Sequence, residues 1–123
     1  MNKFHFGTIG AVLTVLLVGF LAYMQAAPSK YDGFAQCIRD SGAIFYGAFW
    51  CSHCQAQKAL FGRAAGDLPY VECSTPDGQG QNGICQQKKI RGYPTWVYPD
   101  GSVQSGEVSL AELSEKTSCP LPE

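Results

Sequence analysis

The sequence predicts one α/β domain with a mixed central sheet and helices on both faces, preceded by one N-terminal transmembrane helix. Three features support this prediction: an uncharged apolar segment near the start, an apolar strand leading into a Cys-x-x-Cys motif and a helix, and a later strand followed by a hairpin. The 123 residues leave room for one such domain. The net charge of −1 gives no reason to expect nucleic acid as a partner.

The N-terminal segment, residues 1–27, is a membrane anchor or a signal sequence. From Phe6 to Met24 no residue is charged, and a helix of this length nearly matches a hydrocarbon core of about 30 Å. A cleaved signal needs small residues before the cut, whereas Met24 or Gln25 would stand there. The sequence therefore favours an uncleaved anchor, which a polar linker over residues 28–33 joins to the domain.

The cysteine count indicates where the domain lies. Six cysteines form an even set in a short chain, which suggests a disulfide framework in an oxidising compartment and metal binding or catalysis in a reducing one. Combined with the anchor, the count predicts that residues 34–119 form a domain outside the cytoplasm, on the periplasmic or extracellular face. Residues 120–123 are a short tail.

The first half of the domain is predicted to form a helix, a strand and a helix. Residues 34–40 place apolar side chains on one helical face, and residues 43–49 are apolar throughout, which is typical of a strand covered on both faces. The second helix should begin near Cys51 or Ser52, with a bend at Gly62. The side chains expected to face the core from this helix are Leu60, Phe61 and Ala64.

The second half adds a strand, a glycine-rich loop, a short helix, a hairpin and a last helix. A Pro-Asp-Gly turn marks the hairpin, and Ser109 opens a capping-box pattern for the last helix. A β–α–β crossover followed by an antiparallel pair gives the mixed sheet. The first four elements are expected over residues 70–73, 74–83, 84–90 and 95–105, and the last helix starts after residue 109.

The chemistry is expected in the segment from Phe49 to Cys54. Cys51 would lie at the exposed helix N-terminus, where unpaired N–H groups favour a thiolate, and Cys54 would face inward one turn later. This arrangement suits dithiol–disulfide exchange. His53 would donate a hydrogen bond to the Cys51 sulfur or place positive charge near it, and the alternative for His53 is a solvent-facing spacer.

A metal site with four thiolates is the alternative for these cysteines, with Cys73 and Cys85 as the second pair. Eleven residues lie between these two, whereas zinc ligands usually stand two to four apart. A metal site would also leave Trp50 and the Tyr93-Pro94-Thr95 segment unexplained. No metal is therefore predicted.

The Trp50-Cys51-x-x-Cys54 turn after a buried strand, together with Tyr93-Pro94-Thr95 before a hairpin strand, resembles the thioredoxin superfamily over residues 34–117. Four segments are more narrowly similar to thioredoxin-like domains that are fused to, or encoded beside, bacterial and plant homologues of vitamin K epoxide reductase. These segments are residues 46–51, 57–62, 68–73 and 92–96.

This resemblance implies a thioredoxin-like fold and a role for each residue of the motif. Cys51 would be the attacking cysteine and Cys54 the resolving one. Pro94 would be a cis-proline beside them, while Tyr93 and Thr95 would offer backbone groups to an extended substrate. No cofactor is expected besides the redox-active disulfide of the two cysteines.

The direction of electron flow depends on two positions. Many thioredoxins bury a carboxylate six residues before the first cysteine, where this chain has Phe45, and the proton acceptor for Cys54 is left unidentified. Reducing thioredoxins carry proline in place of His53, whereas disulfide isomerases and the periplasmic dithiol oxidant carry histidine. We therefore expect a potential on the oxidising side of about −220 mV. Trp50 would lie as a lid beside the sulfurs.

The other four cysteines are expected to form structural disulfides. The related domains carry cysteines at the positions of Cys73 and Cys85, and a bridge there would close a 13-residue ring and stabilise the fold by about 3 kcal/mol. A relay of electrons to the active cysteines is the alternative for this pair. Cys37 and Cys119 then remain to pair, although the sequence does not give the distance between them.

The sequence thus predicts a membrane-anchored thiol–disulfide oxidoreductase outside the cytoplasm. Its substrates would be exported proteins with cysteine pairs, and a quinone-linked membrane oxidase of the vitamin K epoxide reductase type would reoxidise it. One alternative is an extracytoplasmic reductase of the kind that serves cytochrome c maturation. The other is a non-catalytic thioredoxin-fold binding module.

Overall fold

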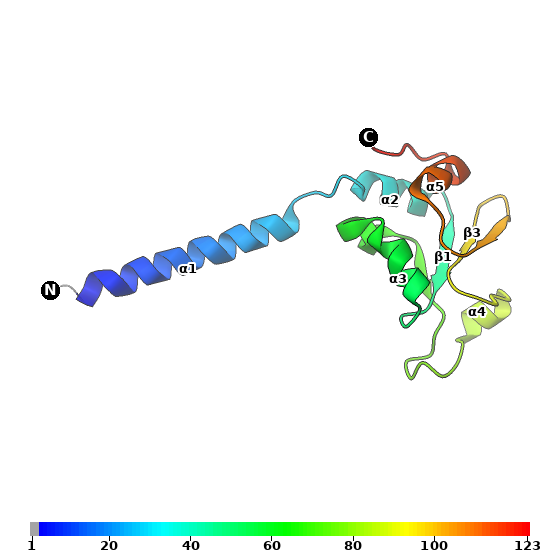
Figure 1. Cartoon of the computed structure of the whole chain (residues 1–123), viewed down its shortest axis with the longest axis horizontal. Coiled ribbons are helices and arrows are strands. Elements are labelled where there is room, and N and C mark those ends of the chain that lie inside the picture. Colours follow the sequence, from blue (N-terminus) through cyan, green and yellow to red (C-terminus); the bar gives the residue numbers. More distant parts are fainter. Residues whose placement is uncertain (1–2) are drawn as a thin grey trace.

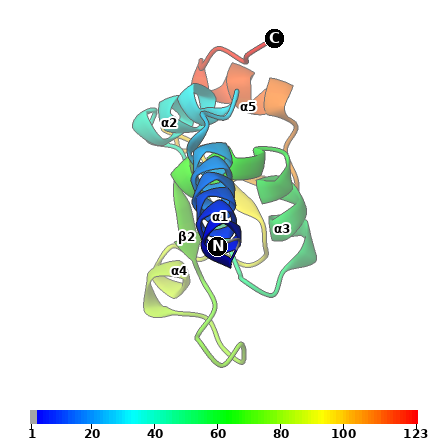
Figure 2. The same cartoon turned by 90° about the vertical axis from the view of Figure 1, so that its left-hand side faces the viewer.

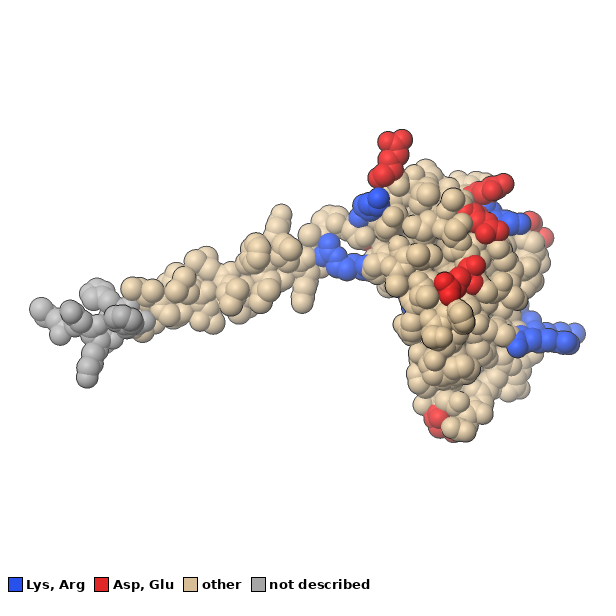
Figure 3. Space-filling model, viewed as in Figure 1, with Lys and Arg blue, Asp and Glu red and all other residues tan. Residues whose placement is uncertain are grey.

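A computed structural model describes residues 3–123 as one long helix joined to a small α/β domain (Figure 1). Helix α1 (Lys3–Ala26) includes a stretch, Gly7–Ala26, with a mean hydropathy of 2.0, which is long and apolar enough to cross a membrane. Figure 3 shows no charged side chain between its grey N-terminal atoms and the start of the domain. Such a helix suits an anchor or a signal sequence. Met1 and Asn2 of the predicted anchor lie outside the described residues.

A basic side chain of the domain covers the end of α1. Arg63 donates from Nη1 to the carbonyl oxygens of Met24 at 2.5 Å and Gln25 at 3.4 Å. The last carbonyls of a helix have no partner within it, so a cation there is favourable. The next helix, α2 (Asp32–Asp40), begins two residues earlier than predicted, inside the expected linker.

The sheet has four strands in the order β2-β1-β3-β4. Strand β1 (Ile44–Gly47) pairs in parallel with β2 (Tyr70–Glu72) and antiparallel with β3 (Thr95–Val97), which pairs antiparallel with β4 (Val103–Ser105). The predicted mixed sheet is therefore confirmed. The central position of β1 explains its continuous apolar sequence, because side chains on both of its faces are covered.

The two faces of the sheet are covered unequally (Figures 1 and 2). Helices α2, α3 (Ser52–Ala59) and α5 (Leu110–Thr117) and the 3₁₀ helix η1 (Gly62–Asp67) pack around one core, whereas the short helix α4 (Gly83–Gln87) lies across β1 from α3. In the first core, Phe45 stacks on Trp96 at 4.8 Å and meets the Tyr70 ring edge-on at 5.1 Å, measured between ring centroids. Other large buried side chains of this core include Phe34, Ile38, Phe61, Tyr98 and Leu113.

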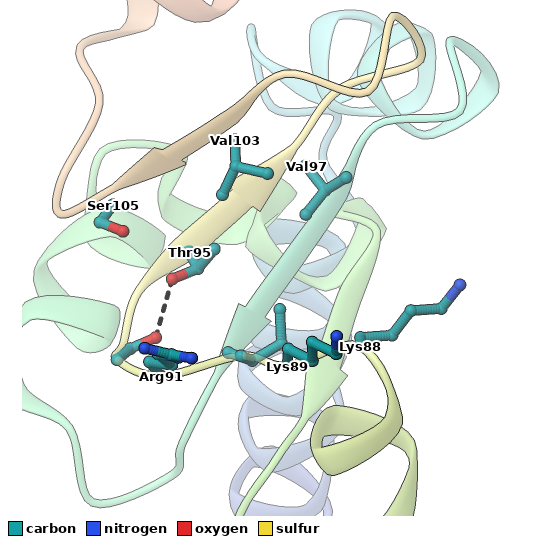
Figure 4. Close-up of a pocket in the computed structure, with 9 residues that line it drawn as sticks. Lys88, Lys89, Arg91, Thr95, Val97, Val103 and Ser105 are labelled. Atoms are coloured by element: carbon teal, nitrogen blue, oxygen red, sulfur yellow. Dashed lines mark hydrogen bonds between the residues drawn. The ribbon is translucent and has the colours of Figure 1, made fainter.

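Helix α4 leaves part of its face of the sheet uncovered near β3 and β4. Figure 4 shows Val97 of β3 beside Val103 of β4 in a shallow pocket rimmed by Lys88, Lys89 and Arg91. All three cations are exposed. They follow the end of α4 and form a solvated basic cluster.

The helix after the motif departs from the prediction at Leu60. This side chain was expected in the core but is 41% exposed, and Gln57 is fully buried instead. Helix α3 ends at Ala59, and Gly62 (φ +56°) redirects the chain into η1. Positions 54, 57, 61 and 64 follow one another at three or four residues and point inward, and Leu60 lies outside this face. The expected bend at Gly62 is present.

Both expected cysteine pairs are bonded in the structure. Cys73 and Cys85 join the end of β2 to α4 with a Cα–Cα distance of 5.5 Å, and Cys37 and Cys119 join α2 to the chain after α5 at 5.8 Å. The first bond uses the two thiols that the metal alternative required. The second ties the start of the domain to its end.

Replacing Cys37 and Cys119 together by serine should lower the free energy of unfolding. The bond spans a sequence separation of 82 residues, and the chain-entropy model gives about 4.5 kcal/mol for a loop of this length. Urea denaturation of the full chain measures the change. The matched variant without Cys73 and Cys85, which are 12 residues apart, should lose less, about 3 kcal/mol. An equal or reversed order would contradict the loop-length argument.

Candidate functional site

Cys51 is the N-cap residue of α3, as the motif predicted. Its Sγ accepts a hydrogen bond from the Cys54 backbone N–H at 3.3 Å, and its thiol faces the Tyr93 carbonyl oxygen at 3.6 Å. Cys51 was expected to be exposed, but the residue is only 8% exposed and is therefore nearly buried. The Cys51 sulfur therefore takes the place of an oxygen cap at the start of α3.

The Tyr93–Pro94 peptide bond is cis, as the resemblance implied, and it brings the Tyr93 carbonyl beside Cys51. The three residues predicted to bind substrate differ in access. Tyr93 is partly exposed, whereas Pro94 and Thr95 are buried. The Thr95 hydroxyl donates to the Gly92 carbonyl at 2.8 Å, the bond drawn in Figure 4. Tyr93 therefore offers the accessible surface of this segment.

Trp50 lies beside the first cysteine on the surface. The indole Nε1 donates to the Ser74 hydroxyl at 2.9 Å, and the ring meets Tyr93 edge-on at 5.9 Å. The loop after β2 supports Trp50 from behind, because a Cβ at Gly78 would lie 3.6 Å from both Trp50 and Phe49. Trp50 and Phe49 are 56% and 49% exposed and form an apolar surface next to Cys51.

His53 points away from the Cys51 sulfur. Its Nδ1 lies 2.6 Å from Oε1 of Glu107, a residue of the segment between β4 and α5. Among the described residues, His53 does not donate the expected hydrogen bond to the Cys51 sulfur. The prediction of this hydrogen bond was therefore wrong. The observed partner of the His53 ring is therefore a carboxylate and not the sulfur. Sequence reasoning missed Glu107 because 54 residues separate it from His53.

Cys54 is completely buried beneath the motif. Burial raises the pKa of its thiol to about 12, a hydrogen bond with Cys51 adds to this shift, and the positive charge of Lys58 opposes it. Gly47 makes the burial possible, since a Cβ there would lie only 3.1 Å from Cys54 Sγ and 2.6 Å from the Tyr70 ring. The two thiols of the motif therefore differ: Cys54 is fully enclosed, whereas Cys51 caps the helix beside the Tyr93 carbonyl.

A polar cluster next to Cys54 was missed by the sequence reasoning. The Tyr70 hydroxyl donates to Oε2 of Glu72 at 2.8 Å, and Lys58 Nζ lies 3.4 Å from the centroid of the Tyr70 ring. Burial is the main cause that raises the pKa of Tyr70, and the hydrogen bond to Glu72 adds to it. Alternation along β2 was the available signal, because residues 70 and 72 share the face that meets α3.

A second missed residue, Gln57, supports the site from below. Its amide donates from Nε2 to the Val108 carbonyl at 3.0 Å and accepts at Oε1 from the Val108 N–H at 2.7 Å. A buried amide satisfied on both sides fixes α3 against the chain before α5. Gln57 stands one turn after Cys54, so the inward face of the helix could have indicated it.

Alkylation of the reduced chain between pH 7 and 9 should modify Cys51 and spare Cys54. Cys54 stays protonated in this range because its pKa is raised to about 12, and its sulfur is buried. Iodoacetamide labelling followed by peptide mass analysis measures both sites. Labelling in urea is the control, since unfolding exposes both thiols. Equal native rates at the two positions would contradict the asymmetry of the site.

Comparison with known proteins agrees with this geometry. The family model described as Thioredoxin matches residues 26–117. The chain is 48% identical over 108 residues to the thiol-disulfide oxidoreductase LTO1 of Arabidopsis thaliana. This match covers 83% of the chain but only 28% of that relative, so the chain spans less than a third of its length. The chain belongs to the thioredoxin family.

Proposed function

We propose that this chain is a thiol–disulfide oxidoreductase that works as a dithiol oxidant outside the cytoplasm. The observation that carries the proposal is the contrast between the two thiols, with Cys51 at a helix N-terminus beside an exposed apolar surface and Cys54 buried and protonated. The relative that is 48% identical is itself named a thiol-disulfide oxidoreductase.

The proposed reaction begins with the disulfide between Cys51 and Cys54. A substrate thiolate attacks Cys51 Sγ, a mixed disulfide forms, and Cys54 leaves and takes up a proton. A second thiolate of the substrate then attacks the substrate sulfur bound to Cys51, which releases an oxidised substrate and a reduced chain. Two electrons pass from the substrate to the cysteine pair.

His53 supports the oxidising direction. The motif resembles those of disulfide isomerases and the periplasmic dithiol oxidant, which carry histidine at this position, whereas reducing thioredoxins carry proline. Glu107 holds the ring at the domain surface, where it is 71% exposed. The acid that many thioredoxins bury on the central strand is replaced here by Phe45, which is in keeping with a role other than general reduction.

The proposed partners follow from the resemblance and the apolar helix. A quinone-linked membrane oxidase of the vitamin K epoxide reductase type would reoxidise the cysteine pair, and α1 would hold the domain at the same membrane. Two disulfides between four other cysteines favour an oxidising compartment. The substrates would be exported proteins with cysteine pairs, bound along Tyr93 and the surface of Phe49 and Trp50.

The reduction potential of Cys51–Cys54 should lie on the oxidising side of about −220 mV, and His53→Pro should lower it by about 30 mV or more, a tenfold change in the equilibrium constant. Equilibration in glutathione buffers with mass detection measures both values. Ala59→Ser, at the exposed far end of α3, is the control and should leave the potential unchanged. A wild-type value near −270 mV would refute the oxidant assignment.

The Cys54→Ser variant should accumulate mixed disulfides with exported proteins in cells, because the resolving thiol is absent. Non-reducing gels with antibody detection reveal these species, and Cys51→Ser is the matched control that forms none. The redox state of the wild-type pair in the same cells, measured by alkylation shift, should be mainly oxidised. A mainly reduced pair would indicate a reductase, and an absence of trapped species would indicate a binding module.

A further inference from the structure

Proton transfer at Cys54 needs a partner that the thioredoxin pattern does not supply here. The thiol is fully buried and gives up or receives a proton whenever the cysteine pair opens or closes. The usual acid position on β1 is Phe45, whose ring packs between Trp96 and Tyr70. The chain from residue 41 to 66 contains no carboxylate.

Strand β2 brings a hydroxyl to the place where that acid would act. The parallel register sets Tyr70 opposite Phe45 and Glu72 opposite Gly47. A Cβ at Gly47 would lie 3.1 Å from Cys54 Sγ and 3.3 Å from the Tyr70 hydroxyl oxygen. The sulfur and the hydroxyl therefore converge on one point of β1, which is free because Gly47 has no side chain.

A fixed carboxylate lies directly behind this hydroxyl. Oε2 of Glu72 accepts from the Tyr70 hydroxyl at 2.8 Å, while Oε1 accepts from the backbone N–H groups of Phe49 at 3.2 Å and Ser74 at 2.9 Å. These three donors hold the carboxylate in one orientation. Lys58 places its ammonium 3.4 Å from the centroid of the Tyr70 ring, one helical turn after Cys54.

We propose that Tyr70 and Glu72 form the proton relay of Cys54 and replace the buried acid of other thioredoxins from the neighbouring strand. The Tyr70 hydroxyl exchanges the proton with the sulfur, and Glu72 is its final acceptor or donor. Lys58 supports the charge that develops on either group. This proposal depends on the proposed disulfide exchange at Cys51 and Cys54. The same relay would work whether the pair oxidises or reduces its substrate.

Closure of the cysteine pair moves one proton away from Cys54. The Cys54 thiol passes its proton to the Tyr70 oxygen, directly or through one water molecule, as Tyr70 passes its own proton to Glu72. The Cys54 thiolate attacks Cys51 Sγ, the bond between the two sulfurs forms, and the bond from Cys51 to the substrate sulfur breaks. The substrate leaves as a thiolate. When the pair opens, Cys54 leaves and the proton returns from Glu72.

The charged and titratable groups around Cys54 come from two elements. Helix α3 and its N-cap contribute Lys58 and Cys51, and β2 contributes Tyr70 and Glu72. The residues of β1 on this face, Phe45 and Gly47, carry no titratable group. Raised pKa values at Cys54 and Tyr70 keep both protonated at neutral pH. Glu72 is the carboxyl group of this cluster, and it already accepts the hydrogen bond of the Tyr70 hydroxyl.

The test uses the reduced full chain in detergent and the chromogenic disulfide 5,5′-dithiobis(2-nitrobenzoate). Attack by Cys51 releases one nitrothiobenzoate and leaves a mixed disulfide, and attack by Cys54 then releases the second. Stopped-flow absorbance separates the two phases. Tyr70→Phe and Glu72→Gln should each slow the second phase by about 10²-fold at pH 7, the lower end of general acid–base effects, and shift its pH profile upward. The first phase should stay within about twofold of wild type.

Two variants elsewhere in the chain serve as matched controls. Tyr98→Phe removes a hydroxyl that bonds to Gln104, and Glu112→Gln neutralises a carboxylate that bonds to the same side chain. Both should leave the two phases unchanged. An unchanged second phase in Tyr70→Phe and Glu72→Gln would overturn the relay, as would an equal slowing of both phases without a pH shift, which indicates a structural role. Loss of the first phase in wild type would instead deny exchange at Cys51.

Discussion

The arrangement of the site depends on how closely Cys54 approaches the backbone of β1 at Gly47. Any side chain at Gly47 would meet the sulfur and the Tyr70 ring, so this glycine sets how deeply α3 can settle on the sheet. That depth buries Cys54 completely, leaves Cys51 at the N-terminal end of the same helix and raises the pKa of the Cys54 thiol. A pair with this asymmetry can be attacked at one sulfur only, which is what stepwise exchange requires.

Around this contact, the rest of the chain mainly limits motion. Gln57 fixes α3 against the segment before α5, Glu107 holds His53 at the surface, and Ser74 holds the Trp50 indole. The disulfide between Cys73 and Cys85 fastens the loop that carries Ser74. These supports converge on the motif from both edges of the sheet, so the small domain holds its reactive sulfurs in place with one main core and a short helix on the second face.

Local patterns predicted the order of elements, the mixed sheet and the position of both active cysteines. They failed where a long-range contact decides the outcome. Leu60 was expected in the core, whereas the inward position belongs to Gln57, whose partner Val108 is distant in sequence. His53 was expected at the sulfur because its partner Glu107 is equally distant. The cis bond before Pro94 and the first structural disulfide came from the resemblance to thioredoxins. Tyr70 and Glu72 were placed on the correct strand, but only the register with β1 brings them to Cys54.

The stack of Phe45 between Trp96 and Tyr70 leaves no room for an acid on the central strand. An acid there and the proposed relay from β2 would therefore exclude each other. An aspartate at position 45 would lose both ring contacts and place a carboxylate in an apolar layer, at a cost of several kcal/mol unless a partner is provided. A single substitution therefore cannot convert this domain into one with the acid on its central strand. Phe45, Gly47, Tyr70 and Glu72 would have to change together, and we expect these four positions to vary as a set when such domains diverge.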